Sequence, residues 1–404
     1  MTAKIYEPMS RRTLLGTAAA TAGLATAASI VPFGVAIGAQ AKVRIGILLP
    51  YSGTYAMLGN AITDGLKLRL AEAGGKLGGR DVEFVIVDSQ MSVPKAPQNT
   101  QKLIAKEKVD FLVGPVHSGI AAAMAKIVGR AGNPIMIVPN AGSNAVTGPL
   151  CASNIFRTSF SNWQPAYPGG KVMADDGHKT AVTIAWKYGA GIQMMAAGKS
   201  SFEKAGGKVV KDIQVPFPSV EFQANLSEIA ALKPDAVFAF FSGGGAVKFV
   251  KDYAAAGLKE KIPLYGPGFL TEGVSMAQGA AAEGIKTTLH YADNLDNAAN
   301  KAFRAGYKKM YGKEANVFSV QGYDTGSLLL IAMDAVKGDS GAKKAMIAAM
   351  EKAKIASPRG DISFSAAHNV VQDIYLRKVV KGHQNLMGVV AKQLADPARG
   401  CRLA

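Results

Sequence analysis

The four residues Val116-His117-Ser118-Gly119 place a hydroxyl beside an imidazole, the pair from which serine hydrolases build a nucleophile and its base. They lie between an apolar segment typical of a strand and a segment typical of a helix, the setting of a nucleophile elbow. That elbow requires glycine two positions before and two positions after the serine. Val116 and Ile120 stand there instead, and adjacent side chains such as His117 and Ser118 would diverge. The pattern therefore argues against a hydrolase.

A serine at the start of a helix has a second use. Its hydroxyl can cap the helix, and the free N–H groups beside it can hold an anion such as a carboxylate. Ser143 follows the next predicted strand as Ser118 follows its own. Both positions lie at the carboxyl ends of predicted parallel strands, where open α/β sheets bind ligands. We interpret Ser118 and Ser143 as candidate anion-binding residues, with a plain helix cap as the alternative for each.

Motifs for nucleotides and metals are absent from the sequence. No G-x-G-x-x-G follows a predicted strand and no G-x-x-x-x-G-K-[ST] occurs, which argues against a nucleotide-dependent enzyme. The five histidines are dispersed, and Cys151 and Cys401 are isolated, so no zinc site is expected. The sequence thus predicts a protein with no metal, no cofactor and no catalytic residue.

Alternating strands and helices must position these serines. Strand-like segments alternate with helical patterns and then the pattern restarts, which predicts two α/β units with parallel sheets. The segment 147–168, rich in Pro, Ser, Asn and Gly, is typical of a crossover between them. The predicted strands are 43–49, 82–88, 111–114, 134–138, 181–186, 209–215, 236–241, 263–266 and 285–291. Three helical stretches and three strands at 361–364, 371–380 and 385–390 complete the chain.

The first 41 residues have the pattern of an export signal. Arg11 and Arg12 precede an uncharged stretch from Leu14 to Ala39, which ends in the small-x-small sequence Ala39-Gln40-Ala41. The adjacent arginines resemble the twin-arginine export pathway. A transmembrane anchor is the alternative, but Gly, Ala, Thr and Ser dilute the stretch. We predict cleavage after Ala41 and a periplasmic mature protein.

Length and charge narrow the function classes further. A chain of 404 residues exceeds one ordinary core, so two domains are expected. The formal net charge of +17 could suggest nucleic acid. The signal segment holds three basic residues and one acidic residue, so the net charge falls to +15 without it, and the rest is scattered along helices. We therefore expect no nucleic-acid partner and a solvated basic surface that at most favours anionic solutes.

Short segments spread along the chain carry a resemblance. They include IGILLPYSG at 45–53, VGPVHS at 113–118, FRT at 156–158, AAGL at 255–258, YGP at 265–267 and GYD at 322–324. Their order and spacing resemble the periplasmic solute-binding proteins of branched-chain amino-acid (Leu/Ile/Val) ABC transporters over essentially the whole mature chain. The resemblance implies the type I periplasmic-binding fold, in which two Rossmann-like lobes joined by three crossovers close on a solute. It places the first lobe at 42–157 and 291–365 and the second at 158–290 and 366–404.

The resemblance also implies site residues. Ser118 and Ser143, with the backbone near Ala141, match the groups that hold a ligand carboxylate. Tyr188 matches a tyrosine of the second lobe that closes on the ligand, and Ser242 lies at another closing position. The remaining candidates are the neighbours of these groups and the aromatic residues that could form apolar walls: Asn140, His117, Asn162, Tyr55, Phe241, Gly268, Phe269, Phe160 and Trp163.

One departure from the family decides the expected ligand. Amino-acid binders place an acid after the Gly-Pro of the 265–267 segment to pair with the α-ammonium, but Gly268 and Phe269 stand there. Without a carboxylate the site cannot balance a buried ammonium at reasonable cost. We expect an organic acid without an amine, with an aromatic or hydrophobic body. The segment 156–162 and the two cysteines also resemble a subgroup that binds aromatic carboxylates.

The sequence therefore predicts a solute-binding protein, not an enzyme, that delivers a small organic acid to an inner-membrane ABC permease and acts as a monomer. Two cysteines in an exported protein suggest a disulfide between Cys151 and Cys401. Three alternatives stay open. The ligand could be a branched-chain amino acid or an amide, the chain could be a sensor module of the same fold, or Ser118 and His117 could serve a hydrolase.

Overall fold

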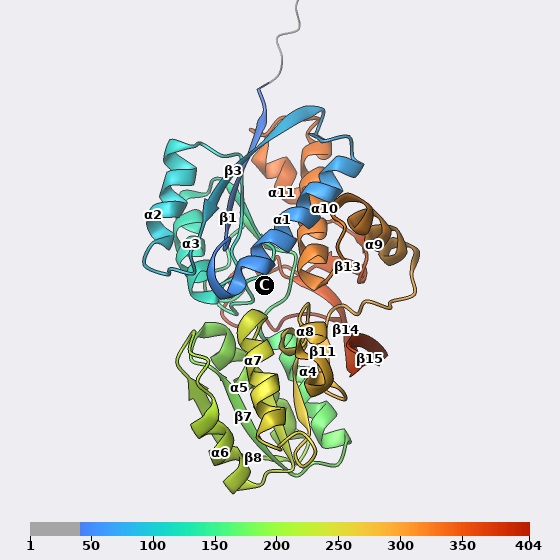
Figure 1. Cartoon of the computed structure of the whole chain (residues 1–404). Helices are drawn as coiled ribbons and strands as arrows, with labels where there is room; N and C mark the ends of the chain where they lie inside the picture. Colours follow the sequence, from blue (N-terminus) through green and yellow to red (C-terminus); the bar gives the residue numbers. More distant parts are fainter. Residues whose placement is uncertain (1–40) are drawn as a thin grey trace, which may run out of the picture. The chain divides into compact units, whose positions relative to one another are not determined.

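The computed structural model of the protein describes residues 41–404. The predicted signal peptide lies outside the described residues, except for its last residue, Ala41. The described part forms two α/β lobes, which Figure 1 shows one above the other. This arrangement confirms the two-lobed α/β fold expected from the sequence. Within residues 41–404, no helix combines the length and the hydropathy needed to span a bilayer.

The first lobe is built on a six-stranded sheet with the order β2-β3-β1-β4-β5-β6. Its strands pair in parallel except that the short β2 runs antiparallel to β3. The central strands are buried on both faces, as the continuous apolar segments of a covered parallel sheet require. The strands are β1 (Val43–Leu49), β2 (Lys76–Leu77), β3 (Arg80–Asp88), β4 (Phe111–Val113), β5 (Ile135–Val138) and β6 (Ile155–Arg157).

Helices cover both faces of this sheet, and some of them come from late in the chain (Figure 1). Helices α1 and α10 cross closely because glycine stands at the contact. A Cβ on Gly65 would lie 1.9 Å from the carbonyl oxygen of Ser319, and one on Gly322 would lie 1.9 Å from that of Ile62. The helices of the first lobe are α1 (Ala56–Glu72), α2 (Ala96–Gln101) with a π-helical turn at Lys102–Lys106, α3 (Ser118–Ala131), α9 (Ala298–Tyr311), α10 (Val317–Ala335) and α11 (Lys343–Glu351).

The second sheet is mixed, with antiparallel strands from the end of the chain beside the predicted parallel ones. Its strands β7 to β11 run parallel, but β14 pairs antiparallel with β11, and β13 and β15 pair antiparallel with β14. The antiparallel part arises because the chain returns from the first lobe and then folds back on itself as a hairpin. The strands are β7 (Thr180–Trp186), β8 (Lys208–Val215), β9 (Ala236–Phe240), β10 (Leu264–Pro267), β11 (Lys286–Leu289), β12 (Ile355–Ser357), β13 (Gly360–Phe364), β14 (Val370–Val380) and β15 (His383–Leu394).

Helix α4 (Trp163–Asp175) begins inside the segment that the sequence assigns to a crossover. Pro165 lies in the first turn of this helix, where a missing N–H costs no hydrogen bond. Pro168 lies inside it. The prolines therefore made the sequence typical of a loop, although they do not prevent the helix. The other helices of the second lobe are α5 (Gly189–Lys204), α6 (Gln223–Leu232), α7 (Gly243–Ala255) and α8 (Ser275–Gln278).

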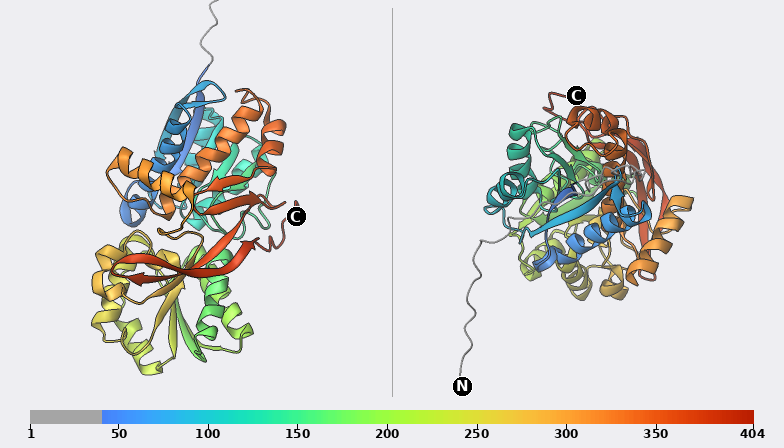
Figure 2. Two further views of the ribbon diagram at one scale, coloured as in Figure 1. Left: turned by 90° about the vertical axis from the view of Figure 1, so that its right-hand side faces the viewer. Right: turned by 90° about the horizontal axis from the view of Figure 1, so that it is seen from above.

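The chain passes between the lobes after β6, after β11 and before β14, and buried arginines hold these segments. Arg157 donates its Nε to Asn369 Oδ1 at 2.7 Å. Arg359 donates to the carbonyl oxygen of Ser159 at 3.0 Å and forms a fully buried ion pair with Asp324 at 2.9 Å. Strands β14 and β15 lie at this junction (Figure 2). Hydrogen bonds and an ion pair between residues far apart in the sequence therefore hold the segments that connect the lobes.

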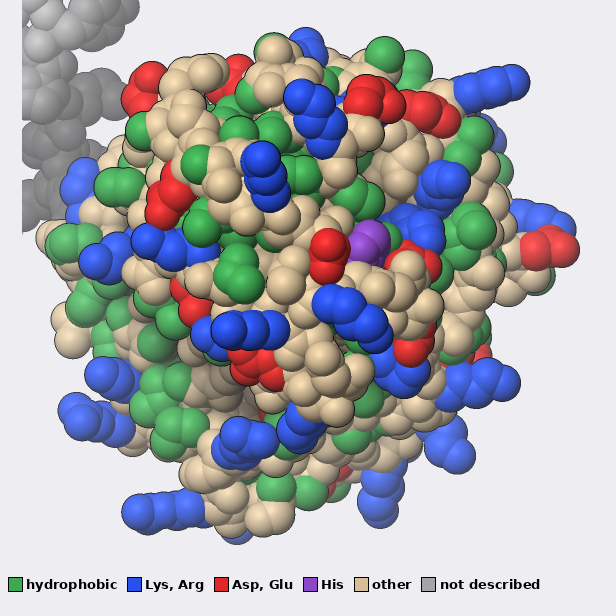
Figure 3. Space-filling model, turned by 90° about the horizontal axis from the view of Figure 1, so that it is seen from below, with side chains coloured by type: hydrophobic (Ala, Val, Ile, Leu, Met, Phe, Trp, Pro, Cys, Tyr) green, Lys and Arg blue, Asp and Glu red, His purple; other side chains and the backbone are tan. Residues whose placement is uncertain are grey.

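The C-terminal tail is covalently attached. The sulfur atoms of Cys151 and Cys401 are bonded, their Cα atoms lie 5.5 Å apart, and 250 residues separate them in the sequence. The bond ties the tail after β15 to the segment that leads into β6. On the face shown in Figure 3, lysine and arginine side chains are spread among acidic ones rather than gathered in one patch.

Candidate ligand-binding site

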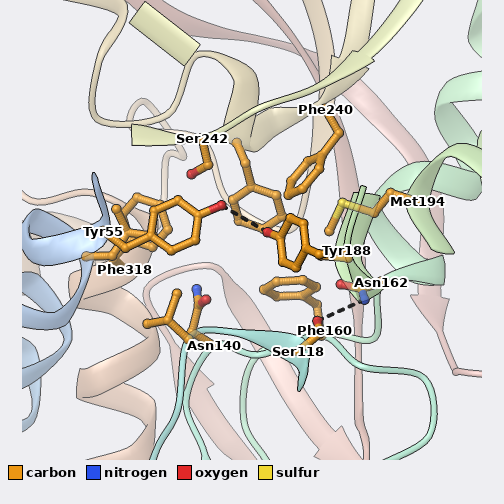
Figure 4. A pocket seen from close by; sticks show the side chains of 15 residues that line it. Tyr55, Ser118, Asn140, Phe160, Asn162, Tyr188, Met194, Phe240, Ser242 and Phe318 are labelled. Carbon is orange, nitrogen blue, oxygen red and sulfur yellow. Dashed lines mark hydrogen bonds between the residues drawn. The ribbon is translucent and has the colours of Figure 1, made fainter. Parts of the chain in front are cut away.

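A pocket lies between the two lobes and encloses about 300 Å³ of empty space, part of it open to solvent. Aromatic rings and neutral polar groups line it. The lining residues are Tyr55, Leu58, Val116, Ser118, Asn140, Gly142, Phe160, Asn162, Tyr188, Ala190, Met194, Phe240, Ser242, Phe269 and Phe318 (Figure 4).

Three helices begin at this pocket. Helix α3 begins at Ser118, α5 follows Tyr188 and α7 follows Ser242. Each N-terminus carries unpaired N–H groups and a partial charge of about half a positive elementary charge. None of the 15 lining side chains is charged. The local field therefore favours an anion, although no lysine or arginine reaches the pocket wall.

A hydrogen bond joins the lobes across the pocket. The hydroxyl groups of Tyr55, from the first lobe, and Tyr188, from the second, lie 2.9 Å apart. Burial raises the pKa of both phenols, so both stay neutral. One hydroxyl of the pair donates to the other, which leaves one proton for a ligand oxygen. Figure 4 shows this bond in the middle of the pocket.

Ser118 is oriented by its neighbours. Its Oγ accepts a hydrogen bond from Asn162 Nδ2 at 3.3 Å, and the same Nδ2 donates to Gln193 Oε1 at 2.7 Å. The Ser118 hydroxyl proton has no acceptor among residues 41–404. Ser118 is 3% exposed, so this proton points into a site that water barely reaches. A ligand carboxylate is the kind of acceptor that such a donor fits.

Asn140 is held from helix α10. Its Nδ2 donates to Gln321 Oε1 at 2.7 Å, and Gln321 Nε2 lies 3.1 Å from His290 Nε2. The His290 ring stacks on Phe160 with centroids 5.3 Å apart. Burial, and secondarily the charges of Arg359 and Arg377, lowers the pKa of His290 well below its usual value. A neutral histidine therefore supports both an amide and a ring of the pocket wall.

His117 does not line the pocket, in contrast to its prediction as a ligand-binding residue. Its Nδ1 accepts a hydrogen bond from the N–H of Gly119 at 3.0 Å and caps helix α3. Its ring stacks on Tyr188, with centroids 4.8 Å apart, and contacts Phe217 at 5.5 Å. Burial lowers its pKa to about 4. The imidazole is therefore neutral and supports Tyr188 from behind.

Phe241 also lies outside the pocket, and its neighbour Phe240 takes the predicted place. Adjacent side chains at the end of a strand point to opposite faces. Phe241 therefore packs into the core against Trp186 and Phe249, with centroids 5.2 and 4.4 Å away. Trp163, a further candidate for the pocket wall, stacks instead on Tyr167 with centroids 4.6 Å apart.

Ala141 and Ser143 are buried beside the pocket but do not line it. The N–H of Ala141 donates to the carbonyl oxygen of Pro115 at 3.0 Å. The carbonyl oxygen of Ser143 accepts from Arg157 Nη1 at 2.7 Å. The N–H of Ala141 is therefore already bonded within the protein, and of these three loop residues only Gly142 lines the pocket.

Gly268 lies behind the wall, and only Phe269 of that pair lines the pocket. A Cβ on Gly268 would lie 2.3 Å from Arg377 Nη2, so no acid could stand there without displacing the arginine. Arg377 Nη1 pairs with Glu272 Oε2 at 2.5 Å, and Glu272 Oε1 accepts from the N–H of Val317 at 2.8 Å. The nearby carboxylate is therefore already neutralised and cannot receive a ligand ammonium.

The structure thus brings eight of the predicted residues into one pocket: Tyr55, Ser118, Asn140, Phe160, Asn162, Tyr188, Ser242 and Phe269. Phe240, Phe318, Met194 and Leu58 line it without having been predicted. Phe318 comes from helix α10, far along the chain. The residues that could hold a metal ion do not gather in threes anywhere in the described chain.

Comparisons with known proteins agree with this geometry. Residues 42–384 match the family described as periplasmic binding protein. A protein of Brucella melitensis named Leu/Ile/Val-binding protein homolog 6 is 33% identical over 346 residues, which cover 84% of this chain and 88% of that protein. A crystal structure of an R. palustris ABC-transporter solute-binding protein in complex with benzoate is 53% identical, has a TM-score of 0.88, and covers 90% of this chain and 100% of that one. A second R. palustris solute-binding protein, in complex with 4-hydroxybenzoate, is 31% identical with a TM-score of 0.83, over 90% of this chain and 100% of that one.

Proposed function

This chain belongs to the periplasmic binding protein family, as a solute-binding protein of an ABC transporter and not an enzyme, and we propose that its ligand is an aromatic carboxylate of about the size of benzoate. The observation that carries the proposal is the composition of the pocket wall. It combines aromatic rings, three helix N-termini and neutral donors, and it contains no acid. The similarity to the benzoate-bound protein of R. palustris supports the same ligand class.

Each part of such a ligand meets matching chemistry. The rings of Phe160, Phe240, Phe269 and Phe318 provide apolar walls for an aromatic ring. The Ser118 hydroxyl and the N-terminus of α3 provide donors for the carboxylate. Because the pocket wall comes from both lobes, the ligand stabilises their closed arrangement. We propose that the closed form then presents the acid to an inner-membrane permease.

The amino-acid alternative lacks a partner for the ammonium group. In the pocket wall no carboxylate is present, and Glu272 behind it is paired with Arg377. An uncompensated ammonium in such a site costs several kcal/mol by the measure of broken buried ion pairs, about 3–5 kcal/mol. A pocket that excludes ammonium groups in this way would still admit an acid without an amine.

We also propose that residues 1–41 act as an export signal of the twin-arginine type, so that the mature chain works in the periplasm. Membership of a periplasmic family and the Cys151–Cys401 disulfide support this location. N-terminal sequencing of the exported protein should begin at Lys42. A retained N-terminus on the exported protein would contradict this part.

A thermal-shift panel on the mature chain tests the proposed ligand class. The probes are benzoate, 4-hydroxybenzoate, cinnamate, benzamide and leucine. A cognate ligand at a hundredfold excess over its Kd should add about 2.7 kcal/mol to the unfolding free energy. We expect aromatic carboxylates to raise Tm and leucine to leave it unchanged. A shift with leucine, and none with any aromatic acid, would refute the proposal.

A further inference from the structure

We propose that Ser242 recognises a second polar group on the ligand, so that the pocket selects aromatic carboxylates that carry a ring hydroxyl over the unsubstituted acid. The proposal rests on the proposed function and names the ligand more narrowly. It starts from a single unexplained atom. The Oγ of Ser242 is buried, and no hydrogen-bond partner for it exists within residues 41–404. Buried hydroxyl groups in native proteins are nearly always hydrogen-bonded, so an unpaired one requires an explanation.

The ordinary explanation for a serine at this place is a helix cap, and it does not apply. Ser242 is the N-cap residue of α7, with an extended backbone (φ −148°, ψ 159°), but its side chain makes no capping bond. A capping serine would accept from an N–H in the first turn. Gly243 follows with φ +57°, a conformation that favours glycine. The hydroxyl is therefore turned away from the helix that it would cap, and Ser242 lines the pocket instead.

The surroundings of Ser242 leave its hydroxyl little access to bulk solvent. Ser242 is 3% exposed. The first lobe covers it: a Cβ on Gly243 would lie 2.6 Å from the carbonyl oxygen of Thr54, and Tyr55 follows in the pocket wall. Aromatic rings form the rest of the wall near it (Figure 4). A ligand that fills the pocket displaces water from this hydroxyl, so the ligand must then supply the polar partner.

The position of Ser242 defines where that group sits on the ligand. Figure 4 shows Ser242 and Ser118 on opposite sides of the hydrogen-bonded pair Tyr55 and Tyr188. With the carboxylate at Ser118 and the aromatic ring between the phenylalanines, the far edge of the ring faces Ser242. A phenolic hydroxyl there can both donate to and accept from the serine, whereas a C–H leaves it unpaired. A hydroxybenzoate therefore satisfies both ends of the pocket, and benzoate satisfies one.

Calorimetric titration tests this assignment with benzoate, 3-hydroxybenzoate, 4-hydroxybenzoate and 4-methylbenzoate as probes. We expect one hydroxybenzoate to bind about tenfold tighter than benzoate, which corresponds to about 1.4 kcal/mol. The methyl compound, of similar size but without a hydroxyl, should gain nothing. In Ser242→Ala the advantage of the hydroxybenzoate over benzoate should shrink to within about twofold, because the serine hydroxyl that pairs with the ring hydroxyl is gone.

Ser89→Ala is the matched control. The Oγ of Ser89 is likewise buried and without a partner in the described chain, but Ser89 does not line the pocket. This variant should keep the preference for the hydroxybenzoate. Equal loss of benzoate and hydroxybenzoate in Ser242→Ala would indicate a purely structural role and overturn the assignment.

The two proposals fail in different ways. If benzoate binds and no hydroxyl isomer is preferred, or if Ser242→Ala keeps the preference, the inference about Ser242 is wrong while the proposed ligand class stands. If none of the aromatic acids binds, both are wrong.

Discussion

Removal of the Ser118 hydroxyl is the perturbation that most sharply separates a carboxylate site from a merely apolar one. The Oγ accepts from Asn162 Nδ2 at 3.3 Å, and in the described structure its own proton has no acceptor. In Ser118→Ala the Asn162 amide keeps its stronger bond to Gln193 Oε1, at 2.7 Å. The substitution therefore removes one ligand contact, and within the protein it removes only the longer of the two hydrogen bonds that the Asn162 amide donates.

The size of the effect follows from the charge on the ligand. A hydrogen bond to an ionised group contributes roughly 1.5–3 kcal/mol, against about 0.5–1.5 kcal/mol for a neutral one. Ser118 is 3% exposed, so water cannot replace its hydroxyl easily. We expect Ser118→Ala to weaken benzoate binding by about 10- to 150-fold. Benzamide, which is neutral and nearly the same shape, should lose about tenfold at most.

Isothermal titration of both ligands against both proteins measures this difference. Ser143→Ala is the control, since Ser143 was a candidate by sequence but lies outside the pocket wall. Its Kd for benzoate should change by less than about twofold, because the substitution removes no side chain from the pocket wall. A Ser118→Ala protein that binds benzoate as tightly as the wild type would refute the carboxylate assignment. So would a larger loss in Ser143→Ala than in Ser118→Ala.

Three further outcomes follow from the structure. Phe217 reaches from the second lobe to contact Tyr55 and Trp186, with ring centroids 5.9 and 5.2 Å away. Phe217→Ala should therefore speed ligand release, measured by stopped-flow Trp fluorescence. Phe217→Leu, which keeps an apolar side chain there, should not. Reduction of the Cys151–Cys401 bond should lower the unfolding free energy by up to about 5 kcal/mol in the loop-entropy model; an unchanged Tm with dithiothreitol would contradict this. Because burial lowers the pKa of His117 to about 4, the unfolded chain takes up a proton there first, near pH 6.5. The stability contributed by neutral His117 is full above about pH 6.5 and is lost as the pH falls toward 4, by up to about 3 kcal/mol. In His117→Asn the unfolding free energy, measured by urea unfolding at several pH values, should depend less on pH over that range.

The positions of three site residues at strand ends could be predicted, because sheet topology determines the edge of the sheet at which each of them lies. Ser118, Tyr188 and Ser242 each stand where a strand gives way to a helix. In parallel sheets all such junctions lie at one edge. The alternating pattern therefore places Tyr188 and Ser242 at one edge of the second sheet and Ser118 at the corresponding edge of the first. The two-lobed fold that the family resemblance implies makes these two edges face each other.

The direction of individual side chains could not be predicted. In the pair Phe240-Phe241 one ring lines the pocket and the other packs on Phe249, and nothing in two adjacent phenylalanines says which. Phe318 reaches the pocket only because α10 docks on α1 through Gly65, a contact between distant parts of the chain.

The loop at 140–143 shows a different limit. The resemblance assigned carboxylate binding to Ala141 and Ser143 by position. Neither residue lines the pocket. The N–H of Ala141 bonds to the carbonyl oxygen of Pro115, and the carbonyl oxygen of Ser143 accepts from Arg157. The conformation of the loop therefore depends on the crossover around Arg157, which no local pattern reveals. His117 was assigned to the ligand for its chemistry, but burial makes it a neutral cap of α3.

The central claim is that the pocket accepts an aromatic acid and rejects an ammonium group. Phenylacetate and phenylglycine test it most directly, since both carry the ring and the carboxylate and only phenylglycine carries the α-ammonium. With no acid in the pocket wall, the ammonium should cost at least about 3 kcal/mol, so phenylacetate should bind at least about 100-fold tighter in a calorimetric titration. Equal or tighter binding of phenylglycine would contradict the account.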